Sequence, residues 1–523
     1  MYLLLPATLD LDKHLLLQPP HQVHNFKQDA LAHLLSLVTE LPAHNRKLAR
    51  RVREGNGFVP ISAKRMQRTV RDYHLYLKYA VKTGLLETDD HYRPASPNRR
   101  GKCTGYRFPA AYCEQSLGGG PTARSHPRVQ LVAVRDEKFA AKVRLRRQHR
   151  PRDLSGEERM RYRAHRHLLG WLEPGDTPFR IDEQAALQAA AEELARQQVD
   201  PSLRRRKSAG WKRRWAHAQD VEQFVDPVEQ YNQRVNTIVR LAGQELNPLL
   251  DHAGGRLHST LTNMSSVLRP YLYAEGQGQL VSLDLANSQP FLLNLLLDPV
   301  FYNPALQKHA GVRRHLRWKE VGKEIRARYK EKGEDIDIML VNTLHESEQQ
   351  ELDKFRAWTS SGQFYQRLRE AMAELGEEEA NLAATPGAVK ELIFLVLFSK
   401  NKYSTPGKRA FSKMFPTVDK VVRLLKKGDH TALPRLLQTL EARLLLLRIG
   451  RQVAKALPQV PVLTIHDSLV VPLPYADQVQ RLMEKELAAQ VGVAPYIKRE
   501  LWGQCVSARQ HEDTPTNYQR HVA

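Results

Sequence analysis

Cysteine is scarce in this 523-residue chain, and long apolar runs are absent. The three cysteines, Cys103, Cys113 and Cys505, are too few for a disulfide framework, and their spacing does not match a zinc site. No apolar run approaches the ~20 residues that a membrane-spanning helix needs. The apolar segment 2–5 is too short for a signal peptide and follows no basic region. We therefore expect a protein of the reducing cytoplasm with no membrane partner.

The sequence also lacks a glycine-rich phosphate loop of the GxxxxGK type and shows no internal repeat. These absences argue against a P-loop nucleotide-binding protein and against a repeat architecture. The length and a hydrophobic content of 41% are sufficient for two to four domains with cores of their own.

Acidic residues are in deficit, with 57 Asp and Glu against 80 Lys and Arg, which gives a formal charge of +23. Such an excess attracts a polyanion, most simply nucleic acid. Basic runs are most often solvated faces, but here tryptophans, on which bases can stack, lie among them. The clusters are Arg144, Arg146, Arg147, Arg150 and Arg152, the run 204–207, and the run 212–214 between Trp211 and Trp215.

Residues 1–25 show no regular pattern, whereas the segment up to residue 115 follows the order helix, helix, strand, basic loop, strand. This order resembles a winged helix, which usually reads DNA with one helix and its wing. We therefore expect a winged-helix-like nucleic-acid-binding domain over 1–115. A winged helix that binds protein is the alternative. The expected phosphate contacts on its basic helix are Lys64, Arg65 and Arg68.

Two apolar strands each end in an aspartate. Residues 279–285 include Asp284 and precede an apolar, helix-like run, while residues 462–465 lead into Asp467 and a second strand, 468–472. The latter pattern of strand, tight turn and strand is typical of a hairpin. Taken alone, it indicates an ordinary turn that uses Asp and Ser for local hydrogen bonds.

Two converging carboxylates repel each other unless cations lie between them. Mg²⁺ favours a site of one or two carboxylates, several waters and substrate phosphates. Two such ions can activate an attacking hydroxyl and stabilise a leaving pyrophosphate. Asp284 and Asp467 therefore predict a site for two Mg²⁺ ions, with Mn²⁺ as a possible substitute, if the fold brings them together.

The chain resembles the family A polymerase superfamily, which includes bacterial repair-type DNA polymerases and single-subunit phage RNA polymerases. Asp284 with Ser288-Gln289 is similar to the first palm motif, and the turn around Asp467 is similar to the last. Between them, a helix carries three residues at the spacing of the middle motif. Upstream lies a segment similar to the primer–template-contacting motif. The last palm motif comprises His466-Asp467-Ser468, the middle motif comprises Lys390, Phe394 and Phe398, and the upstream segment comprises Arg256, His258, Asn263 and Arg269.

The resemblance implies roles for these residues. Asp284, Asp467 and the carbonyl of Leu285 would hold the metal ions, and Lys390 would act in catalysis by neutralising the triphosphate. The nucleotide-binding residues would be Lys390, Phe394, Phe398, Ser288 and Gln289. The nucleic-acid-binding residues would be Arg256, His258, Asn263, Arg269 and His466.

The chain departs from the family pattern at positions that bear on the sugar of the nucleotide. Gln289 or Pro290 lies where the DNA polymerases carry a Glu that blocks a 2′-hydroxyl, and Ser468 is as in the phage RNA polymerases. Pro386 lies where the family usually has an Arg, and Phe398 replaces a Tyr. The resemblance thus implies nucleotidyl transfer and leaves the sugar open.

We therefore expect an α+β protein: a right-hand polymerase with an antiparallel-sheet palm and helical fingers, preceded by the winged-helix-like domain. Residues 116–225 would be a basic, partly helical linker or thumb-like region, and 226–523 the palm and fingers. The expected function is template-directed synthesis, with DNA favoured, from nucleoside triphosphates on a primer–template or duplex, as in replication of a mobile element. The alternatives are an RNA polymerase or primase, a non-catalytic replication initiator and a two-metal nuclease. Because the first half lacks further acidic motifs, we expect no proofreading exonuclease.

Overall fold

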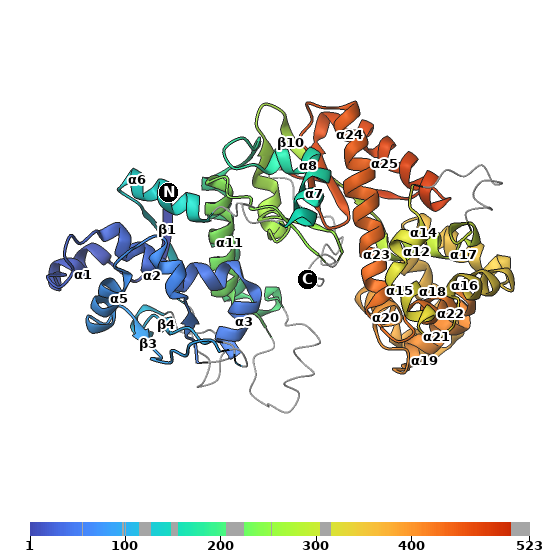
Figure 1. Ribbon diagram of the computed structural model, residues 1–523, viewed down its shortest axis with the longest axis horizontal. Helices are drawn as coiled ribbons and strands as arrows, with labels where there is room; N and C mark the ends of the chain where they lie inside the picture. Colours follow the sequence, from blue (N-terminus) through green and yellow to red (C-terminus); the bar gives the residue numbers. More distant parts are fainter. Residues whose placement is uncertain are drawn as a thin grey trace.

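A computed structural model describes residues 1–54, 56–96, 99, 101–113, 127–147, 155–205, 224–252, 254–303 and 315–503. The chain is a mixture of helices and antiparallel sheets, so its class is α+β (Figure 1). Within these residues, no helix is long and apolar enough to span a bilayer. The basic run 212–214, its two tryptophans, Arg150, Arg152 and Cys505 lie outside the described residues.

The N-terminal elements form a lobe with a core of its own, at the left of Figure 1. Its three short strands pair in the order β2-β4-β3, all antiparallel. Ser62 caps α4 because its side chain accepts a hydrogen bond from the backbone N–H of Arg65. The elements are α2 (Gln28–His44), α3 (Arg46–Glu54), β2 (Val59–Pro60), α4 (Ala63–Gln67), α5 (Tyr73–Lys82), β3 (Glu87–Thr88) and β4 (Gly105–Arg107).

The expectation of an irregular lead over residues 1–25 is wrong. Strand β1 (Tyr2–Pro6) pairs with β5 (Val129–Ala133), and α1 (Leu11–Leu17) follows it. Leu3, Leu4 and Leu5 are all buried, so the strand is covered on both faces and shows no polar alternation in its sequence.

The middle of the chain connects the N-terminal lobe to the rest. Helix α11 (Pro227–Ala242) packs against α9 (Glu183–Val199) and α2, and it lies between the lobe and the larger body in Figure 1. A buried ion-pair cluster joins the same parts, with Arg147 between Glu40 and Glu245. The remaining elements here are α6 (Glu137–Arg147), α7 (Gly156–Ala164), α8 (Arg166–Leu169) and β6 (Phe179–Ile181).

An antiparallel sheet of six strands forms the centre of the larger body. The order is β11-β12-β10-β9-β6, and β13 pairs with β10 on the side away from β12. Helix α25 (Ala476–Val491) packs against β10 and β12, and helix α12 (Ser288–Leu296) packs against α25. The strands are β9 (Leu272–Ala274), β10 (Gly278–Leu285), β11 (Leu463–Ile465), β12 (Ser468–Pro472) and β13 (Ile497–Leu501), and β7 (Leu249–Leu250) and β8 (Leu257–His258) form a separate pair.

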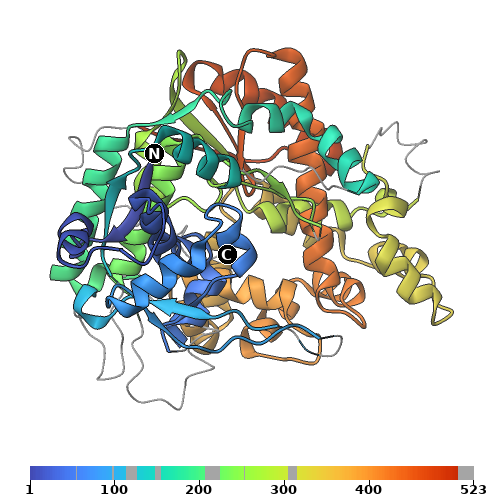
Figure 2. The same ribbon diagram turned by 60° about the vertical axis from the view of Figure 1, so that its left-hand side comes forward.

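A helical lobe, coloured yellow to orange, continues the core of the sheet. In both views the run from α23 (Ala432–Ala442) through a π-helical segment (Arg443–Ile449) to α24 (Gly450–Ala456) extends from this lobe to the sheet (Figures 1 and 2). The other helices are α14 (Trp318–Val321), α15 (Lys323–Lys330), α16 (Ile336–His345), α17 (Gln349–Ser360), α18 (Phe364–Leu375), α19 (Glu377–Leu382), α20 (Pro386–Phe398), α21 (Pro406–Met414) and α22 (Pro416–Leu425).

Candidate active site

The predicted hairpin around Asp467 is present. Strands β11 and β12 pair through Ile465 and Ser468, which leaves a two-residue loop of His466 and Asp467. His466 has a φ of 54°, in the left-handed region that tight hairpin turns require. The hydroxyl of Ser468 donates to the carbonyl of Ile465 at 2.8 Å, so the loop is closed by a side-chain hydrogen bond as well. Asp467 is therefore held on a rigid turn at the edge of the core.

Asp284 reaches the same point from the neighbouring strand. It lies directly across from Ser468 in the antiparallel ladder, and the backbone N–H of Leu285 donates to the carbonyl of Asp467 at 3.3 Å. The two carboxyl groups are close enough to hydrogen-bond each other. Burial and the charge of Asp467 raise the pKa of Asp284 to about 8. Without a cation, the pair therefore retains a proton near neutral pH.

Positively charged side chains from several elements act on the two carboxylates. Burial raises the pKa of Asp467, while the positive charges of Arg256 and Lys390 lower it. Lys498, across the ladder on β13, lowers the pKa of Asp284. Burial and the charge of Asp467 together raise the pKa of Tyr365, the second residue of α18, well above its usual range. Tyr365 and Lys498 therefore lie near the pair, although the sequence indicated neither of them as a site residue.

Helix α20 presents the predicted fingers residues on one face. Thr385 caps it by accepting from the N–H of Ala388, and Pro386 occupies the first turn. The rings of Phe394 and Phe398 stack, with centroids 5.3 Å apart and an angle of 18° between planes. The ammonium of Lys390 lies 5.8 Å from the Phe394 ring centroid.

No family model and no curated protein matches this chain. Among solved structures, it is similar to the POL domain of Pol1 from M. smegmatis in a complex with DNA primer-template and dNTP. The alignment has 13% sequence identity and a TM-score of 0.23, and it covers 65% of this chain and 65% of the length of that one. The assignment of function therefore depends on the geometry of the site.

A buried carboxylate that the sequence did not indicate organises one wall of the site. Glu441, at the end of α23, is 2% exposed. Its Oε1 accepts from Nε and Nη2 of Arg256 at 2.9 and 2.7 Å. Its Oε2 accepts from the Ser288 hydroxyl at 3.1 Å and from the Gln289 amide at 2.9 Å. Burial and the charge of Asp467 raise the pKa of Glu441, so it lies within electrostatic reach of the pair. The one sequence signal is an acidic residue within a leucine-rich helix.

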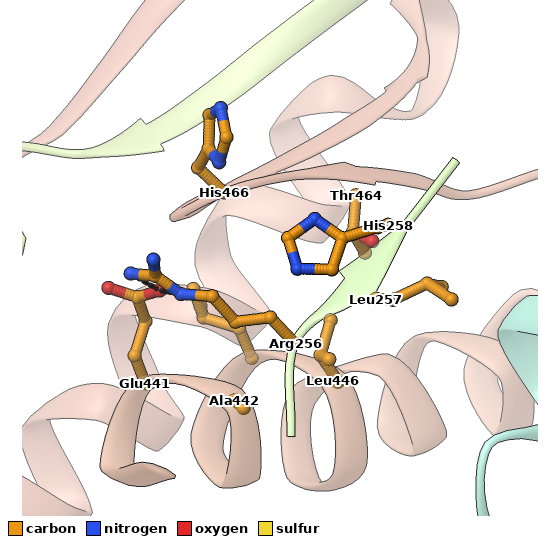
Figure 3. A pocket seen from close by; sticks show the side chains of 9 residues that line it. Arg256, Leu257, His258, Glu441, Ala442, Leu446, Thr464 and His466 are labelled. Carbon is orange, nitrogen blue, oxygen red and sulfur yellow. Dashed lines mark hydrogen bonds and ion pairs between the residues drawn. The ribbon is translucent and has the colours of Figure 1, made fainter. Parts of the chain in front are cut away.

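Three of the predicted nucleic-acid contacts lie together at this wall. Arg256, His258 and His466 line one pocket with Glu441 (Figure 3). His258 also approaches Asp251, with Nε2 3.1 Å from the carboxylate. Burial and the charge of Arg256 lower the pKa of His466, which favours its neutral form at pH 7.

The other predicted residues lie elsewhere or are occupied. Asn263 is exposed. Arg269 donates to both oxygens of Glu500 at 2.9 Å and lies over the ring of Trp502. Leu285 is buried in the ladder opposite Ile497. The remaining three, Lys64, Arg65 and Arg68, are exposed at or just after α4 in the N-terminal lobe.

Proposed function

We propose that this chain is a template-directed nucleic-acid polymerase, which transfers nucleotides from triphosphates to a 3′-hydroxyl. The observation that supports this best is the meeting of Asp284 and Asp467 at the ends of two paired strands. The pKa of Asp284 is raised to about 8. The pair therefore binds a proton or a cation readily, because either one removes the repulsion between the carboxylates.

The donor set fits Mg²⁺, with Mn²⁺ as a substitute. Within the described residues, no group of three or more His, Cys, Asp or Glu side chains forms a closed metal site. Two carboxylates with the carbonyl of Leu285 leave positions that waters and substrate phosphates would fill, as Mg²⁺ prefers. When bound, two such ions supply an activated 3′-hydroxyl and charge neutralisation for the triphosphate.

The face of α20 that carries Lys390, Phe394 and Phe398 would bind the nucleotide. The positive charge of Lys390 acts on Asp467, so this lysine could neutralise a triphosphate bound at the pair. The parallel aromatic rings offer a surface for the base and sugar. Ser288 and Gln289, at the start of α12, border the same site through Glu441.

Arg256, His258 and His466 would contact the primer terminus and its template, since they line one pocket beside the pair. Asn263 and Arg269 would extend this surface. In the N-terminal lobe, the sequence of elements from α3 to β4 and the strand order β2-β4-β3 support a winged-helix-like unit. Its exposed Lys64, Arg65 and Arg68 would contact the phosphate backbone of duplex DNA.

We favour DNA as the product, and one observation supports RNA synthesis, or priming, as a second candidate. A Glu that would block a 2′-hydroxyl is absent after Asp284, and Gln289 is instead fixed by its amide to Glu441. A neutral side chain held away in this manner leaves room for a ribose.

The test is extension of a labelled primer–template with Mg²⁺, with deoxynucleotides and ribonucleotides supplied separately. We expect template-matched extension by the wild type and its loss in Asp467→Asn and in Asp284→Asn, with both variants folded. The preferred nucleotide decides between DNA and RNA synthesis. Absence of incorporation from either pool, together with tight duplex binding, would instead indicate a non-catalytic replication initiator.

A further inference from the structure

We propose that Lys498 binds a phosphate group of the substrate beside Asp284, on the flank of the carboxylate pair opposite to Asp467. This inference rests on the proposed function and adds a residue that the polymerase motifs do not contain. The ligand is a phosphate of the nucleoside triphosphate or of the primer-strand backbone, and the binding measurements below distinguish the two.

The register of the sheet places Lys498 next to Asp284. Strand β10 lies between β12 and β13, and Asp284 is the direct partner of Ser468 on one side and of Lys498 on the other. Directly paired residues of antiparallel strands project to the same face, with Cβ atoms about 5 Å apart. The two flanking strands thus bring a carboxylate and an ammonium to opposite sides of Asp284.

Lys498 is available for a ligand. Its side chain is exposed, and within the described residues it forms no ion pair. By contrast, the next residue of the strand, Arg499, pairs with Asp477. The charge of Lys498 lowers the pKa of Asp284, in agreement with a position close to that carboxyl.

Lys498 lies on the face of the sheet away from α25. Successive residues of a strand point to opposite faces, so Arg499 points away from the site. Arg499 pairs at 2.7 Å with Asp477 of α25, the helix that packs against β10 and β12. The face of Asp284 and Lys498 is therefore the one not covered by α25. An exposed ammonium beside a carboxylate pair suits a polyanion that brings its own cations.

The chain itself supplies a matched control. Lys498→Met and Arg499→Met each remove one positive charge from the same strand, but only the first alters the face that carries Asp284. Lys498→Arg restores the charge. Each full-length protein is titrated, with Mg²⁺, against a labelled primer–template whose primer ends in a dideoxynucleotide. A second titration adds a labelled nucleoside triphosphate to the saturated complex, and both affinities are read by fluorescence anisotropy.

We expect Lys498→Met to weaken one of the two affinities about tenfold, with Lys498→Arg near the wild type and Arg499→Met unchanged. Loss in the first titration assigns a backbone phosphate, and the slope of log K against log salt should then become shallower by about one. Loss in the second assigns the triphosphate. Equal affinities for Lys498→Met and Arg499→Met in both titrations would overturn the inference.

A different result would contradict the proposed function, namely the absence of metal-dependent primer extension by the wild type. Binding to a terminated primer needs no chemistry, so the phosphate contact is tested even if extension is absent. A wild type that binds neither ligand overturns both proposals.

Discussion

Arg256 donates two hydrogen bonds to a single oxygen of Glu441, at 2.9 and 2.7 Å, while the other oxygen accepts from Ser288 and Gln289. Three separate parts of the chain meet at this carboxylate: the residue before β8, the start of α12 and the end of α23. Since α12 follows directly on β10, the strand of Asp284, Glu441 fixes both the arginine and the helix that adjoins this strand.

Replacement of Glu441 should therefore affect stability and substrate binding together. Glu441→Ala leaves Arg256 without its counter-charge in a site where it is 25% exposed, and we expect the free energy of unfolding to fall by about 2–3 kcal/mol. The KM for primer–template should rise more than the KM for nucleotide, because Arg256 loses its fixed position. Urea unfolding and steady-state extension measure these effects.

Glu441→Gln provides the graded comparison. Its carbonyl oxygen can still accept from Arg256, but its amide NH2 group is a donor and can accept from neither Ser288 nor Gln289. Its unfolding free energy and KM should lie between those of the wild type and Glu441→Ala. Equal behaviour of the Gln and Ala variants would show that the geometry of the carboxylate is unimportant.

The carboxylate pair should make stability depend on pH when no divalent cation is present. The pKa of Asp284 is raised to about 8 from its ordinary value of 3.8, so between these values the folded state binds more protons than the unfolded state. The contribution of this group to stability is thus present at low pH and is lost as pH rises towards 8. Asp284→Asn lacks this loss, and its advantage over the wild type in EDTA should grow by about 4–5 kcal/mol from pH 4 to pH 8.

Two comparisons complete this measurement. Asp353→Asn, on the surface of α17, serves as the control and should show a difference that stays flat with pH. Added Mg²⁺ should stabilise the wild type at pH 8 and leave Asp284→Asn unchanged, since a cation replaces the proton between the carboxylates. An Asn variant stabilised equally by Mg²⁺ would contradict the assignment of Asp284 as a ligand.

Removal of Lys390 should affect the nucleotide rather than the nucleic acid. Its charge reaches Asp467, and its ammonium lies near the Phe394 ring. We expect Lys390→Met to raise the KM for nucleotide at least tenfold and to leave the affinity for primer–template unchanged. Lys400→Met, an exposed lysine just after α20, is the matched control and should behave as the wild type.

The local parts of the site could be predicted from the residues alone, whereas the meeting of Asp284 and Asp467 was expected only through the family resemblance. The hairpin of Asp467 and the strand of Asp284 follow from short apolar runs that end in turn residues, and this signal is contained within a few positions. Glu441 gives no such signal, because its function depends on Arg256, almost 200 positions away. Strand β1 was missed for a related reason: its buried leucines need β5, across more than 120 residues, to complete the sheet.

The last prediction concerns two buried lysines that hold the end of α20. Lys426 donates to the carbonyls of Val396 and Ser399, and Lys408 donates to the hydroxyl of Ser399 and to the carbonyls of Lys400 and Tyr403. Both lysines are 3% exposed. They satisfy carbonyls that the end of a helix leaves free, and so fix the helix that carries Lys390 and the stacked rings.

Burial and the neighbouring charge of Lys408 lower the pKa of Lys426 from 10.5 to about 8, with Arg423 acting in the same direction and Asp419 against it. Between pH 8 and 10.5 the unfolded state therefore binds more protons than the folded state, and the unfolding free energy contributed by Lys426 rises with pH. Relative to Lys426→Met, the wild type should gain about 2 kcal/mol in unfolding free energy from pH 7.5 to pH 10, as measured by urea unfolding.

Lys427→Met is the control. It removes a neighbouring lysine that pairs with Glu334 at 2.9 Å and should show no such gain. A difference between wild type and Lys426→Met that is constant with pH would mean that Lys426 keeps an ordinary pKa, and that its ammonium is solvated rather than bound to the end of α20.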